Sequence, residues 1–210
     1  MNWLNAFKFR LNTLGIVLIP VCIAIDWVGH TIATGLKLPL FLDSIGTILG
    51  GILAGPWVGG LAGFITNLIS SGTIDPIAAP YSIISLLLGF AAGIAGYLGW
   101  HRRAPGWIAL WLLCFAVASI GSTPLNIFLY KGQSGVVFSD TIVYAGLVKA
   151  HFPTQIAAYL DEAAVDLPDK LITVLVAVLI YSGLPRRYRS LFRLYQPERD
   201  AQEEPAPSRA

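Results

Sequence analysis

The sequence predicts an all-α integral membrane protein, a bundle of about six transmembrane helices. Of its 210 residues, 55% are hydrophobic and only 12% are charged, and the mean hydropathy is +0.67. A water-soluble domain of this size needs a larger polar coat, so we expect the surrounding solvent to be lipid. Glycine accounts for 21 of the residues, and membrane helices tolerate glycine better than soluble helices do.

Six apolar segments are expected to be the membrane-crossing helices. A crossing needs about 20 mainly apolar residues, and a helix that its neighbours cover can be shorter. The segments are residues 11–36, 40–54, 57–70, 81–100, 107–130 and 167–184. The region 131–166 between the last two is too polar to cross freely, and nothing resembles a cleaved signal peptide.

The expected organisation is an N-terminal cytoplasmic segment 1–10, a transmembrane domain 11–184 and a cytoplasmic tail 185–210. The tail is basic at first, which suits a membrane-surface anchor better than a nucleic-acid site. Its end is rich in Glu, Pro and Ala and is expected to be disordered. Cys22 and Cys114 fall inside expected helices, so no structural disulfide is implied.

The distribution of Lys and Arg predicts the orientation. Six crossings place both termini on one side of the membrane. Ten basic residues then share that side and four lie opposite, which fits the positive-inside bias if the termini are cytoplasmic. The inner group is Lys8, Arg10, Arg102, Arg103, Arg186, Arg187, Arg189, Arg193, Arg199 and Arg209, and the outer group is Lys37, Lys131, Lys149 and Lys170.

Small residues recur at every fourth position on the second, third and fourth expected helices. Such rows let two helix backbones approach closely in lipid. They predict three tightly nested helices, with a sharp cytoplasmic turn where Pro56 follows a glycine. Contact with another subunit by one of these faces is the alternative. The rows are Gly46, Gly50 and Ala54; Gly55, Gly59 and Gly63; and Gly89 and Gly93 with Ala92 and Gly96.

Polar side chains gather near the outer ends of the expected helices. Polar groups at membrane depth are energetically costly, so they indicate a functional site. An outward-facing polar cup in an apolar bundle is suited to binding a small molecule. Acidic and amide groups outnumber basic ones, so the ligand should be neutral or cationic, flat and rich in hydrogen-bond donors. The candidate substrate-binding residues are Asp26, Trp27, His30, Asp43, Asn67, Asp75, Tyr81, Asn126 and Asp169.

Several of these polar residues also have structural interpretations. Asp43 stands where a helix begins and could cap it instead of contacting ligand. Asn67 and Asn126 could bridge helices. Asp166 and Lys170 are four residues apart and could neutralise each other on the helix surface.

Asp26 and His30 share one helix face, but two ligands are too few for a metal centre, so no metal site is predicted. Trp27, Tyr81 and Tyr144 could stack on a flat ligand or belong to the aromatic belt at the membrane interface.

Two stretches of this chain resemble a known family. Residues Phe41 to Gly63, continuing to Ile69, combine a short apolar helix, a Gly-Pro turn and a Gly-rich helix that ends in polar Asn67. This pattern is similar to helices two and three of the substrate-binding S components of energy-coupling factor (ECF) transporters. Residues Asp166 to Ala177 are similar to the start of that family's sixth helix, and the size and six expected helices agree over about residues 11–184.

The resemblance implies the fold of an S component and a role in capturing a vitamin or a related small organic micronutrient. The expected partners are a transmembrane T component and two ABC-type ATPases, in the cell (inner) membrane of a bacterium or archaeon. An S component is not itself an enzyme and needs no cofactor, and this chain contains no G-x-x-x-x-G-K-[ST] phosphate loop.

Partner docking is the point where this sequence departs from the family. Many members carry Ala-x-x-x-Ala on the first helix, whereas here that helix contains only Ala24 and Ala33. The docking surface is therefore expected among Gly15, Gly55, Gly59, Gly63, Ala91 and Ala95. Metal-transporting relatives carry a His next to the initiator Met; Asn2 stands there in this chain, which argues against cobalt or nickel.

Two other classes of function remain open from the sequence. A membrane sensory or scaffolding module would lack transport activity and would be favoured by a linked signalling domain. An intramembrane enzyme would need a catalytic dyad within one helix, and only Asp26 with His30 comes close.

Overall fold

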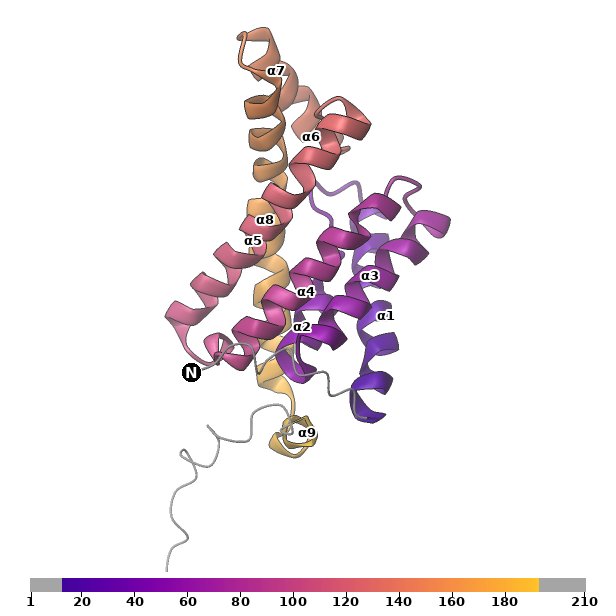
Figure 1. Ribbon diagram of the computed structural model, residues 1–210, viewed down its shortest axis with the longest axis vertical. Helices are drawn as coiled ribbons and strands as arrows, with labels where there is room; N and C mark the ends of the chain where they lie inside the picture. Colours follow the sequence, from indigo (N-terminus) through magenta and orange to yellow (C-terminus); the bar gives the residue numbers. More distant parts are fainter. Residues whose placement is uncertain (1–12, 193–210) are drawn as a thin grey trace, which may run out of the picture.

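The computed structural model describes residues 13–192, and every regular element in that range is helical. Three helices are long: α1 (Thr13–Gly35), α5 (Ala104–Tyr130) and α8 (Thr154–Gly183). Figure 1 shows α5 and α8 side by side, with α1 on the far side of a group of shorter helices. Asn2 and the C-terminal tail beyond residue 192 lie outside the described residues.

The shorter helices α2 (Ile45–Ala54), α3 (Pro56–Thr73) and α4 (Ser82–Tyr97) form the centre of the bundle. Gly55 joins α2 to α3 with a φ of 97°, a backbone conformation that favours glycine. A Cβ atom at Gly89 would lie 2.2 Å from the Gly60 nitrogen, and one at Gly59 would lie 2.7 Å from the Gly51 nitrogen. The expected nesting of these three helices is therefore confirmed, because their backbones touch where side chains would stand.

Short helical segments mark the two ends of the bundle. At one end lie η2 (Ala79–Tyr81), α6 (Val137–Ser139), the π-helical segment η4 (Asp140–Tyr144) and α7 (Ala145–Lys149). At the other end lie η3 (Trp100–Arg102) and α9 (Arg186–Leu191). Figure 1 shows α6 and α7 beside the upper ends of α5 and α8, with α9 below.

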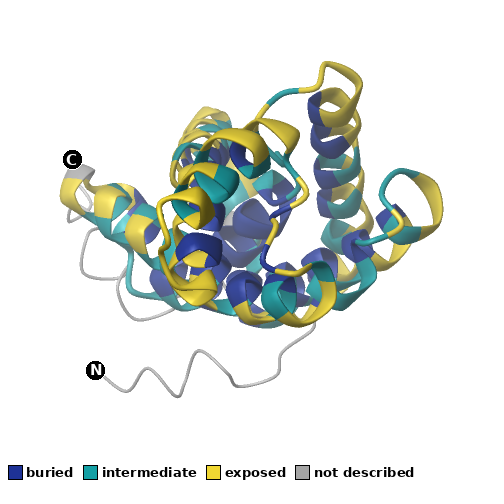
Figure 2. Cartoon of the chain, turned by 90° about the horizontal axis from the view of Figure 1, so that it is seen from above, coloured by how far each residue is buried: buried dark blue, intermediate teal, exposed yellow. Residues whose placement is uncertain are grey.

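The outer surface of the bundle is apolar enough for lipid contact. Three stretches meet the length and composition of a membrane crossing: Thr13–Gly35, Ala79–Tyr97 and Pro105–Tyr130, and α2 is a shorter apolar helix. Large hydrophobic side chains such as Ile16, Val17 and Val21 of α1 are exposed. In the view from above, exposed residues lie mainly on the outside and buried ones inside (Figure 2). The number of crossings, six by the sequence, stays a prediction.

Two helix boundaries differ from the sequence prediction. The last long helix begins at Thr154 instead of residue 167 and continues through Pro168 without a break. Its acidic first half looked too polar to be part of a bundle helix, but most of these acidic side chains turn inward and are paired. The second helix begins at Ile45, not at residue 40. Residues 36–44 form a connecting segment in which Lys37 and Leu42 have positive φ angles of 54° and 51°.

Candidate functional site

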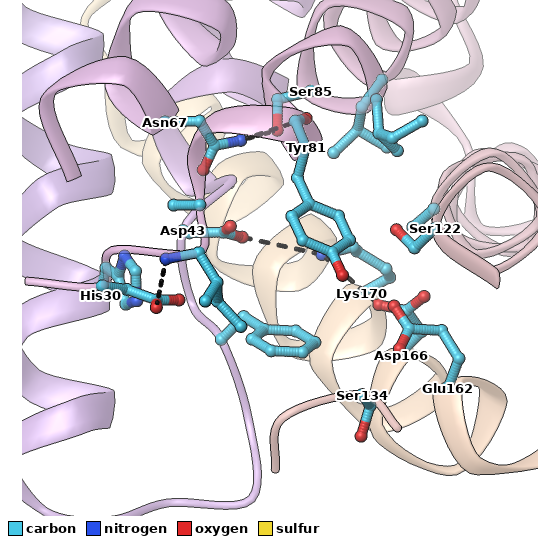
Figure 3. A pocket seen from close by; sticks show the side chains of 17 residues that line it. His30, Asp43, Asn67, Tyr81, Ser85, Ser122, Ser134, Glu162, Asp166 and Lys170 are labelled. Atoms are coloured by element: carbon cyan, nitrogen blue, oxygen red, sulfur yellow. Dashed lines mark hydrogen bonds and ion pairs between the residues drawn. The ribbon is translucent and has the colours of Figure 1, made fainter. Parts of the chain in front are cut away.

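A cavity opens at the end of the bundle where α6 lies. Its enclosed volume is about 70 Å³, and the space reaches about 640 Å³ when the open region at the mouth is counted. Side chains from α1, α3, α4, α5 and α8 and from the connecting segments face it (Figure 3). The lining residues are His30, Phe41, Asp43, Asn67, Asp75, Ile77, Ala78, Tyr81, Ile84, Ser85, Leu88, Ala118, Ser122, Ser134, Glu162, Asp166 and Lys170.

Five of the candidate substrate-binding residues line this cavity: His30, Asp43, Asn67, Asp75 and Tyr81. They lie on α1, on the segment before α2, on α3, on the segment after α3 and on η2, and the packing of α1, α3 and α4 brings them together. His30 is only 6% exposed, and its Nδ1 atom has no hydrogen-bond partner. A buried polar atom without a partner is costly, and a ligand that reached this nitrogen would relieve that cost.

Hydrogen bonds fix one wall of the cavity. Asn67 donates to the Ser85 hydroxyl, which ties α3 to α4. The Tyr81 hydroxyl donates to Asn126, and Asn126 Nδ2 donates to Glu162 Oε2 at 2.8 Å. This chain of contacts links the start of α4 to α5 and α8, and it places the Tyr81 ring over the cavity beside Glu162.

Lys170 lies at the centre of the buried charges. Its Nζ atom donates to Asp169 at 2.6 Å, while its separations from Asp43 and Asp166 are both 3.8 Å. Asp166 also accepts a hydrogen bond of 2.9 Å from Ser119. Asp166 and Lys170 do pair across one helical turn, as considered from the sequence, but their expected place on the helix surface is wrong, because their exposed fractions are 1% and 4% and both line the cavity.

Asp26 holds the beginning of α2. It is fully buried and accepts hydrogen bonds from the Gly46 nitrogen at 2.6 Å, the Thr47 nitrogen at 3.0 Å and the Thr47 hydroxyl at 2.7 Å. The two backbone nitrogens are orphan donors of a helix N-terminus. The capping role considered for Asp43 is thus filled from α1 by Asp26, and Asp43 turns towards the cavity instead.

Three further candidates also lie outside the cavity lining. Trp27 donates to the Thr73 hydroxyl at 3.1 Å, near the surface. Asn126 is fully buried behind Tyr81 and Glu162. Asp169 accepts hydrogen bonds from the backbone nitrogens of Phe41 and Leu42 at 3.0 and 2.8 Å. Asn126 and Asp169 therefore position lining residues of the cavity, whereas Trp27 contacts none of them.

The candidate binding residues predicted from the sequence left out several lining residues, half of them polar. A usable signal existed for three: Glu162, Asp166 and Lys170 recur four apart and so share one face of a helix. The serines carry no such pattern and become visible only in the folded chain. The missed polar and aromatic residues are Phe41, Ser85, Ser122, Ser134, Glu162, Asp166 and Lys170.

A pair of carboxyl groups holds the segment that borders the cavity after α5. The Ser134 backbone nitrogen donates to Asp140 Oδ1 at 2.9 Å and to Asp161 Oδ2 at 3.0 Å. Asp140 lies in η4, outside the membrane-spanning helices. Burial, together with the neighbouring Asp161 carboxyl, raises the pKa of Asp140 to about 6.

The small residues considered for partner docking are enclosed within the chain. Gly15 is buried on α1, the Gly row of α3 packs on α2 and α4, and the exposed fractions of Ala91 and Ala95 are 8% and 0%. In this fold they offer little surface to a second protein. The residues are Gly15, Gly55, Gly59, Gly63, Ala91 and Ala95.

A membrane-embedded helical bundle with a polar cavity at one end defines a membrane protein that binds a small molecule. The chain belongs to the family of substrate-specific components of ECF transporters, because the family model described as "ECF transporter, substrate-specific component" matches residues 15–192. No significant match exists among the curated proteins or the solved structures. Members of this family are substrate-binding subunits that work with a T component and ATPases, and the resemblance found in the sequence is confirmed.

Proposed function

We propose that this chain captures a vitamin or a related small organic micronutrient in the cavity between α1, α3, α4, α5 and α8. The observation that carries the proposal is the cavity itself, whose largely polar lining comes from five helices and includes His30 with its buried, unpartnered Nδ1 atom. The family membership supplies the function of substrate binding for transport.

The charge distribution supports an outward-facing cavity. Arg102 and Arg103 lie between α4 and α5, and α9 contains Arg186, Arg187 and Arg189, all at the end opposite the cavity. With this basic end in the cytoplasm, as the positive-inside bias favours, the cavity opens to the outside and receives its ligand there. A T component energised by two ABC-type ATPases then completes uptake, and it contacts exposed helix faces, since the small-residue rows are enclosed.

The experiment is to identify the small molecule that copurifies with the protein, by native mass spectrometry, and to measure its affinity for three variants. Asp43→Asn and Asn67→Ala alter the cavity wall and should each weaken binding about tenfold to a hundredfold, the effect of about 1 to 3 kcal/mol for unpaired polar groups. Trp27→Phe is the matched control. It removes a hydrogen bond near the same end of the bundle without touching the lining.

The thermal stability of the ligand-free variants separates binding from bracing. Asp43→Asn should keep most of the parent's stability while losing affinity, and Asn67→Ala should lose affinity together with the stability supplied by its contact with Ser85. If both variants lost stability and kept their affinity, the cavity would not be the binding site. The search would then move to the segment between residues 131 and 153.

A further inference from the structure

We propose that the ligand is an organic cation that carries N–H donors, and that its charged group lies against Asp43 and the Nδ1 atom of His30. This inference rests on the proposed function, since it assigns a substrate class to the same cavity. It narrows the expectation from the sequence, which left neutral and cationic ligands open.

The first argument is the charge of the cavity lining. Four carboxyl groups face the cavity, those of Asp43, Asp75, Glu162 and Asp166, whereas Lys170 is the only Lys or Arg among the lining residues. Charges held away from water need a partner or a counter-ion. The lining therefore holds more carboxyl groups than basic groups, and a cationic ligand would balance those that are ionised.

The second argument is that the charge of Lys170 is already engaged. Its ammonium donates to Asp169 at 2.6 Å, and Asp169 is fully buried and is not part of the lining. The lining carboxylates Asp43 and Asp166 are both 3.8 Å from it, at the outer limit of an ion pair. An anionic ligand would have to compete with Asp169 for this one ammonium and would also meet the other carboxylates.

The third argument is independent of charge. His30 is 6% exposed, lines the cavity and has no partner for Nδ1. A neutral imidazole offers one acceptor nitrogen, which an N–H group of the ligand would satisfy. Figure 3 shows His30 and Asp43 on the same side of the cavity, with Tyr81 between them and Glu162. A flat cation can therefore contact the acceptors at one edge and the aromatic ring with its face.

Charge-matched probes test this assignment. Benzamidine, benzamide and benzoate share a ring and a substituent of similar size but carry charges of plus one, zero and minus one, and the three naphthalene analogues extend the set. Binding to the full-length protein in detergent is measured by calorimetry and by the shift in melting temperature. The cation of each set should bind at least tenfold more tightly than its neutral partner, and the anion should bind most weakly.

Two variants assign the contacts. Asp43→Asn should reduce the preference for the cation over the neutral probe without weakening the neutral probe. His30→Leu should weaken the amidines and amides, which both carry N–H donors, while the preference for the cation remains. Trp27→Phe should change neither quantity, because Trp27 does not line the cavity.

The outcomes separate this inference from the proposed function. Tighter binding of the neutral or anionic probes at this cavity would overturn the cationic assignment and leave a substrate-binding cavity intact. If no probe binds, the copurifying molecule decides: a cation with N–H groups supports the assignment, and a neutral or anionic molecule overturns it. If no probe binds and no small molecule copurifies, the result contradicts both the cationic assignment and the proposed function.

Discussion

The contact between α3 and α4 can be tested with a single methyl group. In Gly89→Ala the new Cβ atom would lie 2.2 Å from the Gly60 nitrogen and 2.3 Å from the Gly59 carbonyl carbon, whereas ordinary contact begins at 3.4 Å. Both obstructing atoms are backbone, so no rotamer change relieves the clash. The helices must separate by about 1 Å, which forfeits up to about half of the dispersion energy of the affected contacts. We expect a loss near the upper end of the overpacking range, about 3 kcal/mol.

Gly72→Ala is the matched control, because Gly72 also lies in a helix and a Cβ atom there would meet nothing within 4 Å. Alanine gains up to about 1 kcal/mol of helix propensity over glycine inside a helix such as α4 and less near the end of α3, so lower stability of Gly89→Ala than of Gly72→Ala reports the steric effect. Thermal unfolding in detergent should show Gly89→Ala several degrees below the parent and Gly72→Ala at or above it. Equal melting temperatures for the two variants would refute the explanation of the glycine rows by backbone contact.

The remaining predictions address the scaffold, the loop carboxyls and the orientation. Asp26→Asn should destabilise the ligand-free protein by about 1 to 3 kcal/mol in thermal unfolding, because the amide cannot accept all three bonds at the start of α2; unchanged stability with weakened binding would contradict this bracing role. The pKa of Asp140 is raised from 3.8 to about 6. The protonated Asp140 side chain therefore stabilises the folded protein below pH 3.8, and this stabilisation is lost as the pH rises through about 6. Asp140→Asn should reduce this loss of stability with pH, and the variant should be about 1 kcal/mol more stable than the parent at alkaline pH, since Asp140 is only partly buried. A melting temperature that falls more steeply with pH in the variant than in the parent would contradict this prediction. A C-terminal reporter that is active only outside the cell should stay silent, and a strong external signal would reverse the orientation.

The fold was largely predictable because its signals are local. Long apolar runs mark α1 and α5, and the spacing of small residues marks the faces on which α2, α3 and α4 meet. The beginning of α8 was not predictable in the same way. Asp161, Glu162 and Asp166 lower the apolar content of that stretch, and only their tertiary partners, such as Asn126 and Ser119, make a helix there compatible with a buried position.

The candidate site was predictable in part for the same reason. Polar residues near helix ends can be placed at one level of a bundle, which brought His30, Asp43, Asn67, Asp75 and Tyr81 together correctly. The sequence could not show which way a side chain turns within that level. Both Asp26 and His30 lie on α1 four residues apart, yet Asp26 binds the start of α2 and His30 faces the cavity.

The inward face of α8 couples the cavity to both of its bordering segments. Asp169 binds the backbone at Phe41 and Leu42, on the segment before α2. Two turns earlier, Asp161 binds Ser134, on the segment after α5. Glu162 and Asp166, which face the cavity, lie on the helix between these two anchors. A displacement of α8 itself would therefore shift both segments that border the cavity.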